Sequence, residues 1–246
     1  MTKPLANRIA LVTGASRGIG HATALALANA GAHVVAVART VGGLEELDDA
    51  IRNAGGTATL VPLDLKDFPA IDRLAAALKQ RYGRLDILVG NAGILGPLSP
   101  LDHVPPNEWD DVLAINVTAN WRLIKAFADL LKASDAGRAV FITSGTVHTA
   151  NAYWGPYTTA KAALEAMART FAAETATTNV RVNLLSPGQV RTRMLAMAMP
   201  SMDMSNVEKP DKAAQAVVAM CLPSVTESGQ IFDLRSGKFL AVQAPK

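Results

Sequence analysis

The sequence predicts a single α/β domain, built on a doubly wound parallel sheet of about seven strands with helices on both faces. Short β-branched and apolar runs alternate with Ala- and Leu-rich segments of helical length along the whole chain. The strand-like runs are apolar throughout, which is typical of parallel strands that crossover helices bury on both faces. The chain of 246 residues is long enough for one such domain, 1–246, and requires no second one.

The individual elements follow from the same two patterns. The β-branched runs predict strands at Ile9–Thr13, His33–Ala38, Thr57–Val61, Leu85–Val89, Arg138–Thr143, Val180–Leu185 and Gln230–Asp233. The Ala- and Leu-rich segments predict helices near 18–30, 43–54, 68–82, 107–132, 155–178 and 211–221. The longest irregular stretch, 187–210, follows a strand end and contains Met194, Met197, Met199, Met202 and Met204. It is either a packed loop with methionine as filler or a flap over an apolar substrate.

The composition argues against several classes of protein. The net charge is +3, and the basic residues are scattered, so a nucleic-acid partner is not expected. The single cysteine, Cys221, excludes an intramolecular disulfide and suits a reducing compartment. The apolar run Ile9–Val12 is too short for a signal peptide or a membrane span. We therefore expect a soluble cytoplasmic protein. The histidines show no metal-ligand spacing, so no metal site is expected.

A glycine-rich turn follows the first predicted strand and opens the first helix. It reads Thr13-Gly14-Ala15-Ser16-Arg17-Gly18-Ile19-Gly20. Glycines let the backbone turn tightly and approach a pyrophosphate, and a helix N-terminus offers free N–H groups. The spacing differs from G-x-G-x-x-G, and such a turn alone can be a plain helix entry. Its position favours dinucleotide binding by Gly14, Ser16, Arg17, Gly18, Ile19 and Gly20.

The end of the second strand indicates which dinucleotide is bound. NAD-binding chains usually carry an acidic residue here for the ribose 2′-hydroxyl, whereas this chain has Ala38, Arg39 and Thr40. Arg17 can reach the same region from the glycine turn. Two guanidinium groups without a carboxylate suit a 2′-phosphate, so the sequence favours NADP over NAD, although each arginine alone can be a solvated surface residue.

A tyrosine and a lysine stand four residues apart near the start of a predicted helix. Tyr157 and Lys161 therefore share one helix face, and Ser144 lies thirteen residues upstream of Tyr157. A nearby ammonium is expected to lower the pKa of the phenol. Such a pair can exchange a proton with a substrate oxygen. His148, Tyr153 and Trp154 are candidates for a substrate wall, or simply for loop packing.

Further motifs stand at the ends of the later strands. They are Asp64-Leu65, Asn91-Ala92-Gly93, Asn116 within the predicted 107–132 helix, and Pro187-Gly188 with Val190 and Thr192. Together with the glycine turn, Ser144, Tyr157 and Lys161, they occur in an order that resembles the short-chain dehydrogenase/reductase family over nearly the whole chain. The resemblance implies a Rossmann-like oxidoreductase, most similar to the 3-oxoacyl-[acyl-carrier-protein] reductase group.

The resemblance also implies roles for these residues. Asp64 and Leu65 lie at the adenine, Asn91-Ala92-Gly93 borders the cofactor, and Pro187, Gly188, Val190 and Thr192 hold the nicotinamide carboxamide. Ser144 polarises the substrate carbonyl and Tyr157 protonates it. Lys161 binds the ribose as well as tuning Tyr157, so both are also cofactor-binding residues, and Asn116 holds a water that links Lys161 to solvent.

The expected activity is hydride transfer between NADPH and a carbonyl or alcohol substrate, with 3-oxoacyl thioesters as one candidate. The alternatives are a non-catalytic cofactor sensor or scaffold, or an epimerase or dehydratase relative. A homotetramer or homodimer through the 107–132 and 155–178 helices is implied, with a small-molecule carbonyl or acyl substrate.

Three departures from the family pattern carry expectations of their own. Gly90 stands where the family often has asparagine, and little consequence is expected. The 187–210 flap is short, which suggests an open site or a lid that assembles on binding. The Phe232–Gly237 segment replaces an Asp-Gly-Gly turn, which puts the packing of the C-terminal tail, and any tetramer interface there, in doubt.

Overall fold

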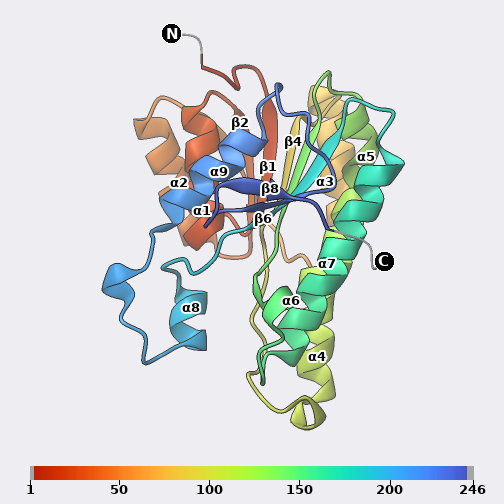
Figure 1. Ribbon diagram of the computed structural model, residues 1–246. Coiled ribbons are helices and arrows are strands. Elements are labelled where there is room, and N and C mark those ends of the chain that lie inside the picture. The colour runs from red at the N-terminus through yellow and green to blue at the C-terminus, as the bar shows by residue number, and fades with distance from the viewer. Residues whose placement is uncertain (1–2, 243–246) are drawn as a thin grey trace.

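An eight-stranded sheet forms the middle layer of the protein, for which a computed structural model describes residues 3–242 (Figure 1). The strand order is β3-β2-β1-β4-β5-β6-β7-β8. The strands are β1 (Ile9–Thr13), β2 (His33–Ala38), β3 (Thr57–Pro62), β4 (Ile87–Gly90), β5 (Arg138–Ile142), β6 (Arg181–Ser186), β7 (Ile231–Asp233) and β8 (Lys238–Leu240). The first seven are parallel, as predicted, and β8 adds a short antiparallel edge that the sequence did not predict.

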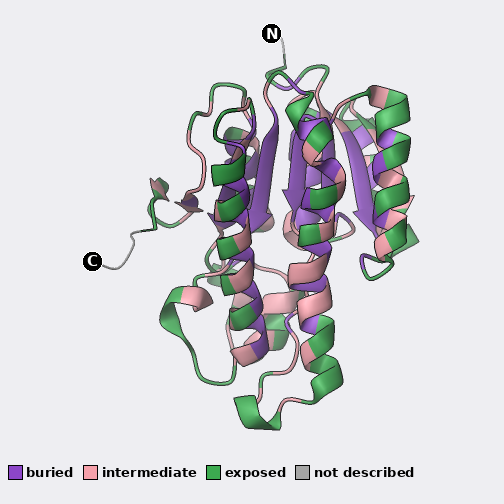
Figure 2. Ribbon diagram, turned by 90° about the vertical axis from the view of Figure 1, so that its right-hand side faces the viewer, coloured by how far each residue is buried: buried purple, intermediate pink, exposed green. Residues whose placement is uncertain are grey.

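Helices cover both faces of the sheet. They are α1 (Gly18–Asn29), α2 (Val41–Asn53), α3 (Phe68–Tyr82), α4 (Pro106–Leu113), α5 (Ala119–Lys132), α6 (Thr146–Thr149), α7 (Gly155–Glu174), α8 (Arg193–Ala198) and α9 (Pro210–Met220). One apolar core lies between the sheet and α1, α2 and α9, and a second lies under α3, α5 and α7. Figure 2 shows these strands buried between helices whose outer faces are exposed. The predicted three-layer fold is confirmed.

The helix predicted over 107–132 is wrong in one respect, because a π-helical turn at Ala114–Thr118 divides it into α4 and α5. The side chain of Asn116 makes two hydrogen bonds to the backbone of Ile94. Its Oδ1 accepts from the Ile94 N–H (2.9 Å), and its Nδ2 donates to the Ile94 carbonyl (2.9 Å). Asn120 Nδ2 donates to the Asn116 carbonyl (2.9 Å). Such turns often mark functional sites. The helix predicted to residue 178 ends at Glu174.

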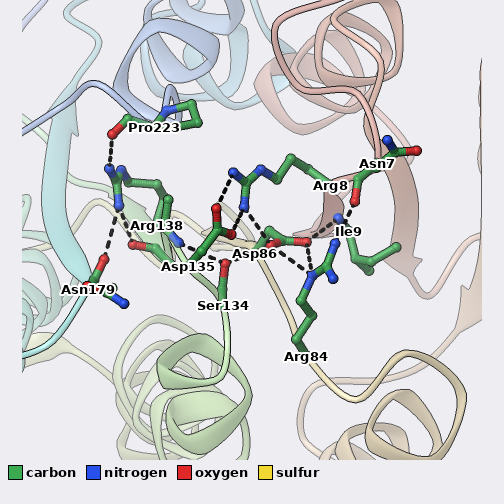
Figure 3. A network of polar contacts seen from close by, with 12 residues as sticks. Asn7, Arg8, Ile9, Arg84, Asp86, Ser134, Asp135, Arg138, Asn179 and Pro223 are labelled. Atoms are coloured by element: carbon green, nitrogen blue, oxygen red, sulfur yellow. Dashed lines mark hydrogen bonds and ion pairs between the residues drawn. The ribbon is translucent and has the colours of Figure 1, made fainter.

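A polar network fixes the edge of the sheet where β1, β4 and β5 begin (Figure 3). Asp86 is fully buried there and accepts hydrogen bonds from Ser134 Oγ (2.6 Å) and Ile9 N–H (2.8 Å). The guanidinium groups of Arg8 and Arg84 neutralise its charge, at 3.0 and 3.2 Å. A buried charge is tolerated only when it is paired, so Asp86 requires these partners. The network thereby links the amino ends of the three strands, opposite the carboxyl ends.

Gly90, at the end of β4, occupies a site with no room for a side chain. A Cβ built there would lie 2.4 Å from Phe141 Cδ1 and 2.5 Å from Asn120 Oδ1. The expectation that this departure from the family pattern has little consequence therefore needs qualification: Phe141 and Asn120 fill the space that an asparagine at this position would need.

Replacing this glycine, as Gly90→Asn, is expected to lower the free energy of unfolding by about 1–3 kcal/mol, because the core has to shift to admit the side chain. Urea denaturation checks the loss. Gly42→Asn is the control for the change of residue type, because Gly42 is an exposed position of α2 where a Cβ would meet nothing within 4 Å. Equal stability of the two variants would contradict the steric argument.

Candidate active site

A cleft of about 1210 Å³ opens at the carboxyl ends of the parallel strands. It lies where the strand order reverses between β1 and β4, the usual ligand site in such sheets. The structure brings most of the predicted residues together along its walls: Gly14, Ser16, Arg17, Gly18, Ile19, Arg39, Thr40, Asp64, Leu65, Asn91, Ala92, Gly93, Ser144, Tyr157, Lys161, Pro187, Gly188, Val190 and Thr192. Gly20 and Asn116 are not among the residues that line the cleft, and each packs against residues that do.

The glycine turn joins β1 to α1 in backbone conformations that favour glycine. Gly14 and Gly18 have φ angles of +66° and +59°. Gly20 serves packing, since a Cβ there would lie 2.2 Å from the Gly14 carbonyl oxygen and 2.4 Å from Asn91 Nδ2. That amide donates to the Thr13 carbonyl (2.8 Å) and so ties the end of β4 to the turn.

Two arginines and one carboxylate lie at the end of the cleft beside β2 and β3. Arg17 precedes α1 and is exposed. Arg39 is 58% exposed and its Nη1 lies 3.9 Å from Asp64 Oδ2, a loose ion pair. Both arginines therefore line the cleft, and Asp64 contributes an opposing charge beside Arg39.

Tyr157 and Lys161 lie on the first turns of α7, a helix that begins at Gly155 with Pro156 in its first turn. Both residues are buried, and Lys161 Nζ lies 5.6 Å from the centre of the Tyr157 ring. The ammonium donates to the Ile142 carbonyl at the end of β5 (2.8 Å). Burial lowers the pKa of Lys161 to about 8, against an opposite, smaller effect of Glu165.

The structure corrects the expectation for Tyr157. Burial raises the pKa of its phenol above the usual value, and the neighbouring Ser144 hydroxyl lowers it by less. The predicted lowering by Lys161 is therefore not found in this structure. Helical spacing correctly placed the two groups together, but the effect of burial on the pKa of the phenol is larger than that of its polar neighbours.

The side chains of Asn116 and Lys161 make their hydrogen bonds to other residues, to Ile94 and Ile142. Both polar atoms of the Asn116 amide are bonded to Ile94, as described above. A Cβ built on Gly93 would lie 3.1 Å from Asn116 Oδ1 and 3.6 Å from Lys161 Nζ, so this glycine separates the two side chains. The predicted water relay stays a prediction, and each polar atom of the Asn116 side chain already makes one hydrogen bond to Ile94.

Among the candidates for a substrate wall, Trp154 lines the cleft and packs edge-on against Tyr157, with ring centres 6.0 Å apart. Tyr153 is 60% exposed, with φ +73°, and His148 lies beside Glu165. Within the predicted flap, Met194 and Met199 line the cleft while Met197 is exposed. The wall is therefore apolar on two sides.

Sequence reasoning missed two residues of this region. Arg235, in the turn between β7 and β8, lines the cleft, and its Cγ lies 3.6 Å from a Cβ built on Gly188. Glu165 lies buried one helical turn after Lys161. The i,i+4 spacing from Lys161 was a readable signal for Glu165, whereas Arg235 reaches the cleft only because the chain folds into a C-terminal hairpin.

Two further observations concern residues 3–242. No group of three or more histidine, cysteine, aspartate or glutamate side chains there is arranged to hold a metal ion. None of the helices in this range is both long and apolar enough to span a membrane.

Comparison with known proteins identifies the family. The short chain dehydrogenase family model matches residues 8–203. The oxidoreductase YciK of Escherichia coli is 35% identical over 238 residues, covering 95% of this chain and 94% of that protein.

Solved structures agree with this. A short chain dehydrogenase from Pseudomonas syringae has a TM-score of 0.91 at 36% identity, over 95% of this chain and 97% of that one. A short chain dehydrogenase from Shigella flexneri complexed with NADP also scores 0.91, at 34% identity, over 96% and 100% of the two chains. The protein belongs to the short-chain dehydrogenase/reductase family of oxidoreductases.

Proposed function

We propose that the protein is an NADP-dependent carbonyl reductase, or alcohol dehydrogenase in the reverse direction, with NADPH preferred over NADH. The observation that carries the proposal is the single cleft wall on which the glycine turn, Arg39, Ser144, Tyr157 and Lys161 lie together. The Shigella flexneri relative complexed with NADP supports the choice of cofactor.

The residues of the cleft suit this cofactor. Gly14 and Gly93 line the cleft, and Arg17 and Arg39 offer exposed guanidinium groups for a 2′-phosphate. Asp64 and Leu65 border the adenine end, while Pro187, Gly188, Val190 and Thr192 border the nicotinamide end. When bound, NADPH supplies the hydride.

The chain's own residues then supply orientation and a proton. Ser144 hydrogen-bonds the substrate oxygen, and the Tyr157 hydroxyl donates its proton to that oxygen as negative charge develops on it. Because its pKa is raised, Tyr157 is protonated at neutral pH, the state that a general acid requires. Lys161 supplies the fixed positive charge beneath the phenol ring and donates to the ribose hydroxyls.

The substrate class follows from the other side of the cleft. Trp154 forms an apolar wall on one side, and Met194, Leu195 and Met199, all in the predicted flap 187–210 that includes α8, form another. A carbonyl compound with an apolar body suits these walls, and a 3-oxoacyl thioester is one member of that class. Arg235, at the rim, adds a positive charge that would favour a substrate carrying an anionic group.

Steady-state NADPH oxidation with a panel of apolar ketones, quinones and 3-oxoacyl thioesters tests the proposal. Net, stoichiometric loss of NADPH is expected with at least one carbonyl class. Binding without consumption would favour a cofactor sensor or scaffold, and product formation without net consumption would favour an epimerase or dehydratase.

A homodimer or homotetramer through α5 and α7 is part of the same proposal, and a cytoplasmic location stays a prediction. Trp121 on α5 is 45% exposed and lies beneath the cationic groups of Arg122 and Lys125, at 5.0 and 5.6 Å from its ring centre. An exposed tryptophan flanked by cations on a helix face is typical of a protein–protein contact.

A further inference from the structure

A buried carboxylate lies directly behind the proposed active site and has no role in the scheme above. Glu165 is on α7, one turn after Lys161, and is only 3% exposed. Burying a carboxylate is costly unless hydrogen bonds and a positive charge compensate, so its neighbours indicate what it does.

Both carboxylate oxygens have a neighbour. Thr143 Oγ1 donates to Glu165 Oε1 (2.6 Å), and His148 Nε2 lies 3.7 Å from Oε2. Thr143 directly follows Ile142, whose carbonyl accepts the hydrogen bond from Lys161 Nζ. The end of β5 therefore holds the carboxylate and the ammonium through consecutive residues. Helix α6, which carries His148, packs beside α7 (Figure 1).

Glu165 follows Lys161 by four residues on α7, so the two side chains share one helix face, and the carboxylate raises the pKa of the ammonium without forming an ion pair within 4 Å. Within α7, Tyr157 and Glu165 are the titratable neighbours of Lys161. Strand β5 contributes the neutral Ile142 carbonyl, and the segments after β4 and around the π turn contribute the neutral Gly93 and Asn116. His148, on α6, has a side chain that is 58% exposed and lies 3.7 Å from Glu165.

We propose that Glu165 is a positioning residue that keeps Lys161 in its ammonium form beneath Tyr157, with Thr143 orienting the carboxylate. This inference deepens the proposed function and rests on it where turnover is concerned. A merely structural link between β5 and α7 would need only a hydrogen-bond acceptor at this position. The negative charge is what distinguishes the two roles.

The sign of the pH effect follows from the surroundings of Lys161. Burial lowers its pKa to about 8, and Glu165 raises it. Removing the charge of Glu165 lowers the pKa of Lys161 further, so that the ammonium is lost at a lower pH. Turnover that needs the ammonium then fails earlier as the pH rises, while activity well below the midpoint changes little.

The variant Glu165→Gln removes the charge and keeps an acceptor for Thr143. The alkaline limb of kcat/KM is expected to move down by about one to two pH units, which is about a tenfold or greater loss above the limb and less than about twofold at pH 6. Glu174→Gln is the matched control, since it makes the same substitution at an exposed position on the same helix and should leave the profile unchanged.

The Lys161 titration is also measured without turnover, by NMR of lysine labelled with ¹³C at Cε in the unliganded protein, with the resonance assigned from Lys161→Arg. A lower midpoint in Glu165→Gln supports the proposal, and an unchanged midpoint overturns it. A shifted midpoint in a protein that reduces no carbonyl would retain the electrostatic inference and reject the proposed function.

A second variant tests the proposal if the Glu165→Gln protein does not fold. Thr143→Val keeps the carboxylate charge but removes the hydrogen bond that orients it. A smaller downward movement of the Lys161 midpoint is expected, because a freed carboxylate turns toward solvent and His148. A midpoint equal to that of the unaltered protein would overturn the proposal.

Discussion

Replacing Tyr157 with phenylalanine is expected to lower kcat about 100- to 10,000-fold, the usual contribution of a positioned general acid. The substitution removes only the hydroxyl. The ring keeps its edge-on contact with Trp154 and its place above Lys161, so the fold and the NADPH affinity are expected to change little.

The measurement pairs turnover with binding. NADPH oxidation gives kcat, and the fluorescence of bound NADPH gives its dissociation constant. Tyr153→Phe makes the same chemical change four residues earlier, at a tyrosine that is 60% exposed, and should retain normal turnover. A Tyr157→Phe protein that binds NADPH normally and turns over at the unaltered rate would refute the acid role.

The pH dependence adds a second, independent check on this residue. Because burial raises the pKa of Tyr157, the phenol stays protonated through neutral pH and serves reduction there. The reverse reaction requires the deprotonated phenol and is therefore expected to gain rate as the pH rises toward about 8, where Lys161 begins to lose its charge. The two directions thus respond with opposite sign to the same protonation step.

Much of the fold could be predicted, because parallel strands that are buried on both faces appear in the sequence as short runs of apolar residues. The predicted bounds of β1 and β2 match the structure, since each strand is a short run of mostly apolar residues that includes several β-branched ones. The π turn at Asn116 could not be predicted in the same way, because it depends on contacts with Ile94 and Asn120 rather than on helix propensity. The edge strand β8 has only three residues and is held in the sheet by its antiparallel pairing with β7, which the sequence pattern does not show.

The candidate site divides along similar lines. Motifs at strand ends predicted which side chains would share a cleft, because parallel strands bring their carboxyl ends to one edge. The direction of the pKa shift of Tyr157 was mispredicted, since spacing along a helix gives proximity but not desolvation. Burial depends on everything packed around the pair, including Glu165, which lies on the same helix and is held by Thr143 at the end of β5.

The double variant Arg17→Ala/Arg39→Ala is expected to weaken NADPH binding about 100-fold or more, since each guanidinium loses a charge-assisted hydrogen bond to the 2′-phosphate worth about 1.5–3 kcal/mol. NADH carries no 2′-phosphate, so its affinity should change less than about threefold. The ratio of the two dissociation constants, measured for each single variant and for the double one, reports the specificity directly.

Asp64 makes the two single variants unequal. Its carboxylate lies 3.9 Å from Arg39 Nη1, so Arg39→Ala removes a phosphate ligand and also leaves a negative charge facing the 2′-phosphate. Arg17 has no such partner among the ion pairs of residues 3–242, so Arg17→Ala should weaken NADPH less than Arg39→Ala. Arg52→Ala, on α2 and outside the cleft, controls for the change in net charge. Equal losses for NADPH and NADH would show that the arginines act on parts common to both dinucleotides, and the preference for NADP would then need another source.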